Sequence, residues 1–346
     1  MKKYLLPEKG SFYKANLHVH TTISDGSLTP EEIKEVYKAK GYSVVAYTDH
    51  AAMVPHPELN DDAFLAITSG ELATNAEMTH GAYNFRETCH MNLYAKDPNK
   101  TSCEVFSMSR LWPDHAINYL TEEMKSTDYK RTFTPESMNE VIAEAKKHGF
   151  IVSYNHPVWS LNHYPFYSKL KGLWGVEVYN TGCVRSGYPD TVQPLDDLLA
   201  LGERVFPLAT DDAHGDRKDF WDYFGGWVMI KADQLAYSAI MDALENGDFY
   251  ASTGPEIKEL YIEDGIVTVK TSSAASIDLT TERRVSKRVY STDGELYTKA
   301  TFDIRSYISD SAKKRVSDPP AYFRLTVTDE KGNKAYSKPF FVDELK

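Results

Sequence analysis

The sequence predicts an α/β barrel followed by a small β-sandwich. Strand-like and helix-like segments alternate from about residue 12 to residue 250, a pattern typical of parallel strands covered by helices. Polar residues follow directly after several strand-like runs, and α/β barrels carry their sites at this end of the strands. After Gly254-Pro255 the chain changes to short β runs and turns. We therefore expect two domains, residues 1–254 and residues 255–346.

The first helix and strand of this alternation begin at Thr29. Thr29 fits a helix N-cap, Pro30 the first helical position and Glu32 the third position of a capping box. The apolar, β-rich run at residues 43–48 comes next and indicates a strand. It leads to His50, so this strand would place an imidazole at the carboxyl end of the sheet.

The same arrangement recurs along the chain. A second helix opens at Thr134-Pro135. Each later strand-like run leads to polar residues: residues 63–67 to Glu71, 150–154 to His156, 174–179 to Asn180, and 205–209 to Asp212 and His214. Because these ends would meet at one edge of a parallel sheet, the sequence predicts a polar site there.

The C-terminal region has the turn pattern of an all-β domain. Asp264-Gly265 separates two β runs, which is a strong hairpin signal. The region of roughly 90 residues has about the size of an immunoglobulin-like sandwich. It holds no catalytic cluster, so we expect a packing, lid or oligomerisation domain, and a homo-oligomer is one open outcome.

The composition is that of a globular protein with an acidic surface. The chain has 346 residues and a formal net charge of −11, which argues against a nucleic-acid polymer as a partner. Its three cysteines, Cys89, Cys103 and Cys183, form no CxxC pair, so a reduced, cytoplasmic setting is expected. No run approaches the ~18 apolar residues of a membrane span, and we expect no membrane partner.

His18 and His20 are the first candidate metal ligands. They follow the strand-like residues 13–17. On a strand, residues i and i+2 face the same side, so both imidazoles would point together. An isolated pair of this kind also arises by chance, so it is weak evidence alone.

Further candidate ligands recur at or near other strand ends. With the first pair they make six histidines and three carboxylates: His18, His20, Asp25, His50, Glu71, His90, His156, Asp212 and His214. One ion takes about four ligands, so this set suits two or three ions with a bridging carboxylate. Nitrogen and oxygen ligands without thiolate suit Zn, Mn or Fe. The sequence therefore predicts two or three divalent metal ions as cofactors.

These residues stand in motifs that resemble the PHP (polymerase and histidinol phosphatase) domain family. The motifs, in order, are His18-x-His20, Ser24-Asp25-Gly26, Thr48-Asp49-His50, Gly70-Glu71, His90, Asn155-His156-Pro157 and Asp212-Ala213-His214, within residues 12–254. The resemblance, to a two-domain member with a C-terminal β module, implies a distorted (β/α)7 barrel, a trinuclear metal site and phosphoester hydrolysis.

The resemblance also assigns ligands to each ion. It gives His18, His20, Glu71 and Asp212 to the first, Glu71, His90 and His156 to the second, and Asp25, His50 and His214 to the third. Asp25 stands where some members have histidine, an exchange that suits a hard cation. Asp211 would lie behind Asp212. Five residues are expected to act in catalysis: His18, His20, Asp25, Asp212 and His214.

A phosphate ester also needs contacts beyond the metal ions. Arg185 and Arg217 are candidate cationic contacts because arginine recognises planar anions, although solvated surface charges are the plainer interpretation. Glu177 lies in the run 174–179 and is expected to face the site. The predicted substrate-binding residues are therefore Glu177, Arg185 and Arg217.

The remaining histidines and the tryptophans have plainer interpretations. Five histidines lie outside the ligand set, and we expect structural or exposed roles for them: His56, His80, His115, His148 and His163. His80 is the one to reconsider, because it lies between two candidate ligands in the sequence. Four tryptophans are candidates for core packing or a pocket wall: Trp112, Trp159, Trp221 and Trp227. Residues 96–101 and 107–131 are expected to be loops or a lid.

Three functions fit this pattern. The preferred one is hydrolysis of a small-molecule phosphate ester by a metal-activated water at a di- or trinuclear site. The second keeps the metal ions but cleaves a carboxylic ester or carbamate, which would need no arginine contact. The third is a non-catalytic PHP-type binding module, and the complete set of nine ligands argues against it.

Overall fold

Seven strands that follow one another in the chain form a curved part of the larger sheet. The computed structural model describes residues 2–77, 86–314, 318 and 320–345. The neighbouring strands, in order, are β2 (Ser11–Val19), β3 (Val44–Tyr47), β4 (Leu65–Asn75), β5 (Thr88–Ala95), β6 (Phe150–Tyr154), β7 (Gly175–Asn180) and β8 (Phe206–Thr210). Their apolar side chains form the main core.

The first and last of these strands meet at their carboxyl ends. The backbone N–H of Asp212 donates to the carbonyl of His18 at 2.8 Å, and that of His20 donates to the carbonyl of Ala213 at 3.0 Å. A parallel bridge between Val19 and Ala213 accompanies these bonds. The strands therefore come together at the end where the sequence places its polar residues.

Strand directions depart from the expected all-parallel pattern at β5. The pairs β2–β3, β3–β4, β6–β7 and β7–β8 are parallel, but β5 is antiparallel to both β4 and β6. Strand β5 was not predicted from the sequence, although its residues alternate between polar and apolar from Thr88 to Leu93, and both faces of the strand are buried.

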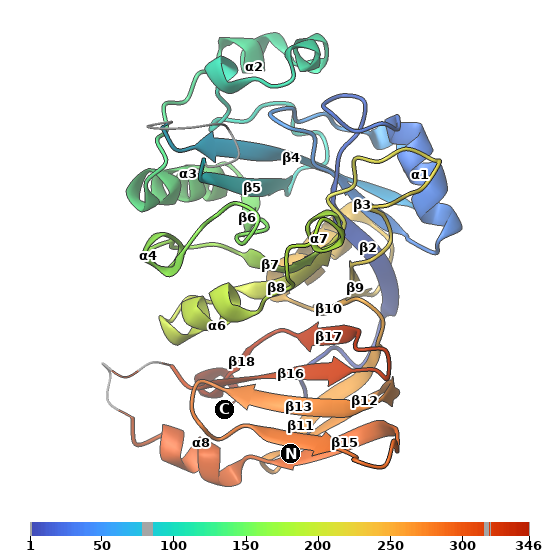
Figure 1. Cartoon of the computed structure of the whole chain (residues 1–346), viewed down its shortest axis with the longest axis vertical. Coiled ribbons are helices and arrows are strands. Elements are labelled where there is room, and N and C mark those ends of the chain that lie inside the picture. Colours follow the sequence, from blue (N-terminus) through green and yellow to red (C-terminus); the bar gives the residue numbers. More distant parts are fainter. Residues whose placement is uncertain (1, 78–85, 315–317, 319, 346) are drawn as a thin grey trace.

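Helices lie around and above these strands, and one further helix belongs to the C-terminal region (Figure 1). The helices near the strands are α1 (Pro30–Ala39), α2 (Glu122–Ser126), α3 (Pro135–Lys147), α4 (Tyr164–Tyr167), α5 (Thr181–Arg185), α6 (Gln193–Ala200) and α7 (Tyr237–Asn246), and the helix of the C-terminal region is α8 (Arg305–Ser311). The predicted capping box of α1 is confirmed, since Thr29 and Glu32 exchange both hydrogen bonds. Within the described ranges, no helix is long and apolar enough to span a membrane.

The segment between β5 and α3 forms a wall above the strand ends. It contains two 3-10 helices, η3 (Met108–Arg110) and η4 (Asp114–Tyr119), as well as α2. Arg131, at its end, donates to the carbonyls of Ala73 on β4 and Val105. The segment predicted as loops or a lid is thus tied to the sheet by a buried arginine.

The C-terminal region is β-rich, and both chain termini lie in it (Figure 1). Strands β9 (Trp227–Ala232) and β10 (Phe249–Ser252) connect the larger sheet to β17 (Lys334–Ser337), β16 (Tyr322–Thr328), β13 (Ser276–Thr281) and β14 (Lys287–Tyr290), and β18 (Phe340–Phe341) pairs with β16. A four-stranded sheet of β1 (Lys2–Tyr4), β11 (Ile257–Glu263), β12 (Ile266–Ala274) and β15 (Tyr297–Asp303) faces it. Side chains from both sheets share one core.

The predicted hairpin at Asp264-Gly265 is confirmed. Strands β11 and β12 pair antiparallel around it. Asp264 and Gly265 have φ angles of 48° and 75°, the left-handed conformations of a tight hairpin turn.

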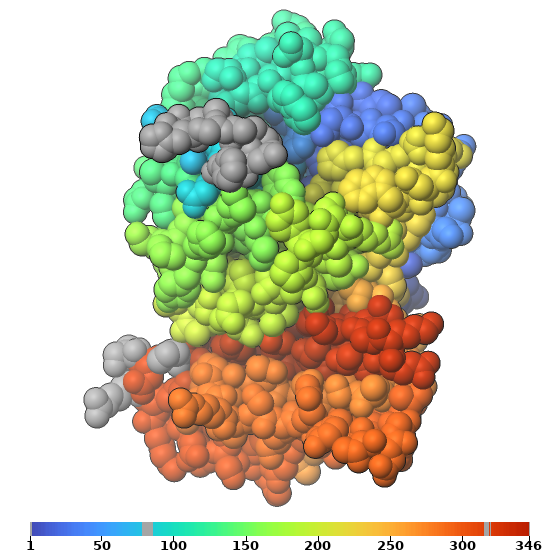
Figure 2. Space-filling model, viewed as in Figure 1, coloured from blue at the N-terminus to red at the C-terminus, as the bar shows by residue number. Residues whose placement is uncertain are grey.

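The two regions form the two ends of the molecule and meet through the shared sheet and an ion pair (Figure 2). Arg324 on β16 is 4% exposed and donates two hydrogen bonds of 2.7 Å to the Asp196 carboxylate on α6. The domain boundary at residue 254 stays a prediction. Strand β1, which that boundary assigns to the first domain, pairs with β11 in the second region.

Candidate metal centre

All nine predicted ligands converge at the end of the sheet where β2 and β8 meet. They come from β2 and the loop after it (His18, His20, Asp25), the end of β3 (His50), β4 (Glu71), β5 (His90), the end of β6 (His156) and the loop after β8 (Asp212, His214). Eight of them belong to groups in which the potential ligand atoms lie within 4.8 Å of one another. Asp212 joins them through the contacts given below.

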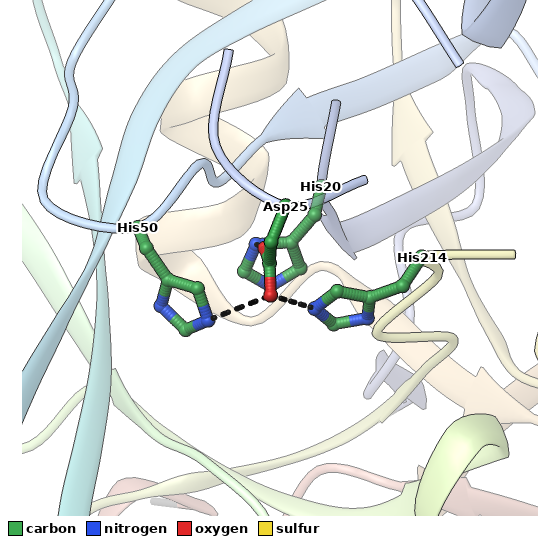
Figure 3. A group of neighbouring side chains, drawn as sticks. All are labelled: His20, Asp25, His50 and His214. Atoms are coloured by element: carbon green, nitrogen blue, oxygen red, sulfur yellow. Dashed lines mark ion pairs between the residues drawn. The ribbon is translucent and has the colours of Figure 1, made fainter. Parts of the chain in front are cut away.

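One group consists of His20, Asp25, His50 and His214 (Figure 3). The Asp25 carboxylate lies in the middle, with its oxygens 3.5 Å from His20 Nδ1, 3.8 Å from His50 Nε2 and 3.5 Å from His214 Nε2. The rings of His20 and His214 stack with centroids 4.1 Å apart. Three imidazoles and one carboxylate make a donor set that suits Zn, Mn or Fe.

Glu71 joins the other groups. Its Oε1 lies 3.3 Å from His18 Nε2, 3.2 Å from His90 Nδ1 and 3.5 Å from His156 Nε2. Its Oε2 lies 2.9 Å from His50 Nδ1 but has no hydrogen-bond partner in the described structure, although it is buried. A buried carboxylate oxygen without a hydrogen bond is costly, and a cation at this position would satisfy it.

Asp212 completes the arrangement from a strained backbone. Its Oδ1 lies 3.1 Å from both His18 Nε2 and His20 Nε2. Asp212 and His156 have positive φ angles of 55° and 26°, which are uncommon for residues with a side chain. Such strain gathers at functional sites because the surrounding structure must hold it in place.

The protonation of two rings fits metal binding. His18 Nδ1 lies 2.7 Å from Glu177 Oε1, and His214 Nδ1 lies 2.8 Å from the carbonyl oxygen of Asp212. Both oxygens only accept, so each Nδ1 carries a proton, which leaves Nε2 as the nitrogen that could bind a metal ion. In both rings this Nε2 faces the carboxylates of the centre. Outer hydrogen bonds of this kind orient histidine ligands.

The carboxylates of the centre are ionised, whereas the pKa values of its histidines shift in both directions. Burial alone would raise the pKa of Glu71, but the surrounding histidine rings, led by His90, outweigh it and hold that pKa well below its usual range. Burial and the neighbouring His214 ring lower the pKa of His20 to about 3. Burial would also lower the pKa of His50, but the Glu71 carboxylate outweighs it and raises that pKa to about 9. A metal ion binds an ionised carboxylate and a neutral imidazole, so its binding would displace a proton from His50.

Glu177 lies behind the candidate metal ligands, and its contact with substrate stays a prediction. It is 2% exposed. Its carboxylate accepts from His18 Nδ1, from Thr210 Oγ1 at 2.7 Å and from the backbone N–H of His156 at 2.9 Å. It therefore positions two candidate ligands.

Two further buried aspartates hold the loops that carry ligands. Asp49 accepts hydrogen bonds from the backbone N–H and side chains of Thr21 and Ser24, in the loop that leads to Asp25. Asp211 accepts from Thr181 and from the backbone of residues 224–226. Asp211 therefore lies behind Asp212, as the motif comparison implied.

A cavity of about 690 Å³ opens onto the centre. Seven predicted ligands line it: Asp25, His50, Glu71, His90, His156, Asp212 and His214. His18 and His20, which were expected to act directly in catalysis, are fully buried and are not in the cavity wall. Their geometry suits metal ligation alone.

The wall of the cavity includes two arginines that the sequence analysis missed. Arg110 and Arg131 come from the segment above the strand ends and line the cavity together with Trp112 and Trp159. The ring of Trp112 lies 5.4 Å from that of His50. No sequence motif marks these arginines, because a long connection carries them over the site.

The two arginines that were predicted to bind substrate are placed elsewhere. Arg185 donates through Nη1 to the carbonyls of Phe220, Trp221 and Tyr223 and so holds that loop. Arg217 forms ion pairs on the surface with carboxylates of α1. Neither residue lines the cavity, so the structure does not bring them to the centre, and their contact with substrate stays a prediction.

Two of the histidines outside the ligand set have local ion-pair partners. His148 lies at the end of α3, 2.9 Å from a Glu144 oxygen, and His56 lies 3.0 Å from a Glu58 oxygen. Both fit the expected structural roles. His80 lies outside the described residues.

Comparison with known proteins gives a family match and distant structural similarities. The PHP domain family matches residues 16–236. A two-domain protein from Bacteroides vulgatus, described as containing a predicted PHP-like metal-dependent phosphoesterase, is 15% identical, with 98% of this chain and 97% of that chain covered and a TM-score of 0.44. No curated protein matches the chain.

Two further solved structures are similar over part of the chain. A Bifidobacterium adolescentis protein, for which metal-dependent phosphoesterase activity has been suggested, is 20% identical, with 62% of this chain and 90% of that chain covered and a TM-score of 0.38. An amidohydrolase from Chromobacterium violaceum, solved with sulfate and no metal, is 16% identical, with 59% and 89% covered and a TM-score of 0.32.

Proposed function

This chain belongs to the PHP domain family, and on that basis we propose that it is a metal-dependent phosphoesterase acting on a small-molecule phosphate ester. The observation that carries the proposal is the convergence of six histidines and three carboxylates on one centre, with Glu71 shared between groups and seven of the nine residues lining one cavity. A shared carboxylate is what neighbouring ions need as a bridge. The complete set also favours an enzyme over a binding module.

The residues present fit two or three divalent ions. The groups around Glu71 would hold one or two, and the group around Asp25 another. When bound, such ions supply positive charge for the phosphoryl oxygens and lower the pKa of an attacking water. Asp25 and His214 are predicted catalytic residues that reach the cavity, with side chains 25% and 30% exposed. We therefore place the scissile ester on this side of the centre.

The proposal is tested by a panel of small esters. The purified protein, supplied with Mn or Zn, would be assayed with phosphomonoesters, phosphodiesters, carboxylic esters and carbamates. We expect turnover of a phosphoester and its loss on chelation. Turnover of carbonyl esters alone would replace the proposal with a carboxylic ester or carbamate hydrolase. Absence of turnover by a metal-loaded sample would favour a non-catalytic binding module.

Four finer assignments accompany this proposal. We propose that the ring of β2 to β8 is the distorted (β/α)7 barrel of the family, and that a domain boundary lies at residue 254. We also propose a cytoplasmic protein, an assignment supported by three buried cysteines without disulfides. The fourth assignment is a homo-oligomer, and light scattering of the purified chain tests it.

A further inference from the structure

Arg110 and Arg131 form a cationic wall in the cavity without an anionic partner of their own. Neither makes an ion pair with any carboxylate in the described part of the chain. The residues outside that part, 1, 78–85, 315–317, 319 and 346, include no aspartate or glutamate. Two neighbouring arginines therefore carry positive charge that no ion pair within the described residues balances, in a chain of net charge −11.

Arg131 is held in place by neutral groups. It is 5% exposed and donates to Thr74 Oγ1 at 2.9 Å, to the Val105 carbonyl at 2.9 Å and to the Ala73 carbonyl at 3.2 Å. A guanidinium has five N–H groups, so about two are left over. Burial lowers the pKa of Arg131, and the negative charge of Asp128 acts against that shift. The Asp128 carboxylate, however, already accepts hydrogen bonds from Lys130, Ser107 and Ser109.

Arg110 lies directly beside Arg131. Its Nη2 donates to the Arg131 carbonyl at 2.9 Å, which fixes the side chain along the wall. Burial, and then the charge of Arg110, lower the pKa of Arg131 to about 10. Two like charges held together and partly desolvated are costly, and an anion between them and the solvent would remove that cost.

The cavity is large enough for a ligand that reaches both the metal ligands and this wall. Its volume of about 690 Å³ is in the range of pockets that hold a whole small molecule. Trp112 and Trp159 lie on its sides, and Trp159 is 5.6 Å from the His90 ring. Arg110, Arg131 and Ser109 also line a neighbouring hollow, so a substituent can extend past them.

We propose that the substrate carries a second anionic group, a carboxylate or a second phosphate, which binds to Arg110 and Arg131 while its phosphate ester lies on the metal ligands. This inference rests on the proposed phosphoesterase function. It names a class of substrate, phosphate esters with a second negative charge. Arg110 would be the specificity-determining contact and Arg131 its buried support.

Matched substrates test this proposal. Phenyl phosphate would be compared with 3-carboxyphenyl phosphate and with the bisphosphate of 1,3-dihydroxybenzene. We expect kcat/KM to be at least tenfold higher for one of the doubly anionic esters. Which of the two is preferred distinguishes a carboxylate from a second phosphate. Equal kcat/KM for all three esters would overturn the proposal.

The variant Arg110→Gln should remove this preference. We expect the ratio of kcat/KM between the preferred ester and phenyl phosphate to fall to within about twofold of one. Arg204→Gln is the matched control, because Arg204 pairs with surface carboxylates of the C-terminal region, and it should keep the ratio of the natural protein. An unchanged ratio in Arg110→Gln would contradict the assignment.

Binding of inert analogues separates this inference from the proposed function. Phenylphosphonate and 3-carboxyphenylphosphonate would be titrated calorimetrically into the metal-loaded protein and into Arg110→Gln. Tighter binding of the carboxylated analogue, lost in the variant, would support the anionic subsite even if no phosphoester is hydrolysed. Turnover of phenyl phosphate with equal binding of both analogues would refute the subsite and leave the phosphoesterase proposal standing.

Discussion

Glu71 is the side chain through which the histidines of the centre are connected. Four histidine nitrogens lie between 2.9 and 3.5 Å from its two oxygens. The carboxylate is ionised and buried, so its charge must be balanced by a bound cation or by its neighbours. Glu71 is therefore the most informative single position for metal binding.

We expect Glu71→Gln to lose at least one bound ion and to lower kcat/KM by about a hundredfold or more, because it removes the bridging charge. Elemental analysis of the purified variant and a steady-state assay check this. Glu104→Gln is the matched control, since Glu104 pairs with Lys100 and His148 outside the centre. An unchanged metal content in Glu71→Gln would contradict the bridging role.

Glu177 acts on the centre through the two candidate ligands that it positions, His18 and His156. We expect Glu177→Gln to weaken metal affinity by about 10- to 100-fold, because the amide is a poorer acceptor for the His18 N–H. Competition with a metal-binding dye measures the affinity. Glu245→Gln, which affects only a surface pair with Lys96, serves as the control. Equal affinities in the two variants would refute the positioning role.

The convergence of the candidate ligands could be predicted from the sequence better than the positions of the residues around them. His18, Glu71 and Asp212 stand in ordered motifs, and the structure brings them together. The positions of Glu177 and Arg110 could not be predicted, because they depend on the rotation of a strand and on the path of a long connection. Such tertiary features leave no local pattern in the chain.

At the scale of the elements, the loop from β2 to α1 must pass very close to the end of β2. A Cβ atom added to Gly26 would lie 2.4 Å from the carbonyl oxygen of His20. This close approach explains why glycine stands next to Asp25. The loop therefore fixes the position of a predicted ligand through its backbone.

We expect Gly26→Ala to displace Asp25 and to weaken the ion in its group at least tenfold, while the groups around Glu71 keep theirs. Metal stoichiometry after dialysis at a fixed free concentration measures this. Ser27→Ala, at the exposed neighbouring position, should behave as the natural protein. Full stoichiometry in Gly26→Ala would show that the loop tolerates a side chain.

The elements with clear local signals were predicted correctly. The capping box of α1 and the hairpin turn at Asp264 are local hydrogen-bonding patterns, and both are present. The antiparallel direction of β5 was not foreseen, because pairing direction is set by its neighbours in the sheet. The polar and apolar residues of β5 do alternate, but the polar face is buried in the centre and does not lie at a solvent-exposed surface.

On the scale of the whole molecule, the β-rich region is joined to the region that carries the candidate metal centre by a shared sheet and by the ion pair between Arg324 and Asp196. We expect Arg324→Gln to destabilise the protein by roughly 3 kcal/mol, because it leaves the Asp196 charge without its partner. Chemical denaturation measures the free energy of unfolding. Metal content should be unchanged, since the pair lies away from the centre.

Arg288→Gln is the control for this change. Arg288 makes a similar two-bond pair with Asp278, but on an exposed edge strand. Exposed pairs contribute about 0–1 kcal/mol, so this variant should unfold nearly as the natural protein does. Equal losses in both variants would mean that burial of the Arg324 pair does not stabilise the contact between the regions.

Anomalous diffraction from crystals grown with Mn tests the central claim most directly. The account predicts at least two strong peaks, one among His20, Asp25, His50 and His214 and one beside Glu71. Soaking with a phosphonate should place its oxygens on the same peaks. Crystals of the folded protein that show no peak at these residues, at saturating metal, would contradict the multinuclear centre and the hydrolase built on it.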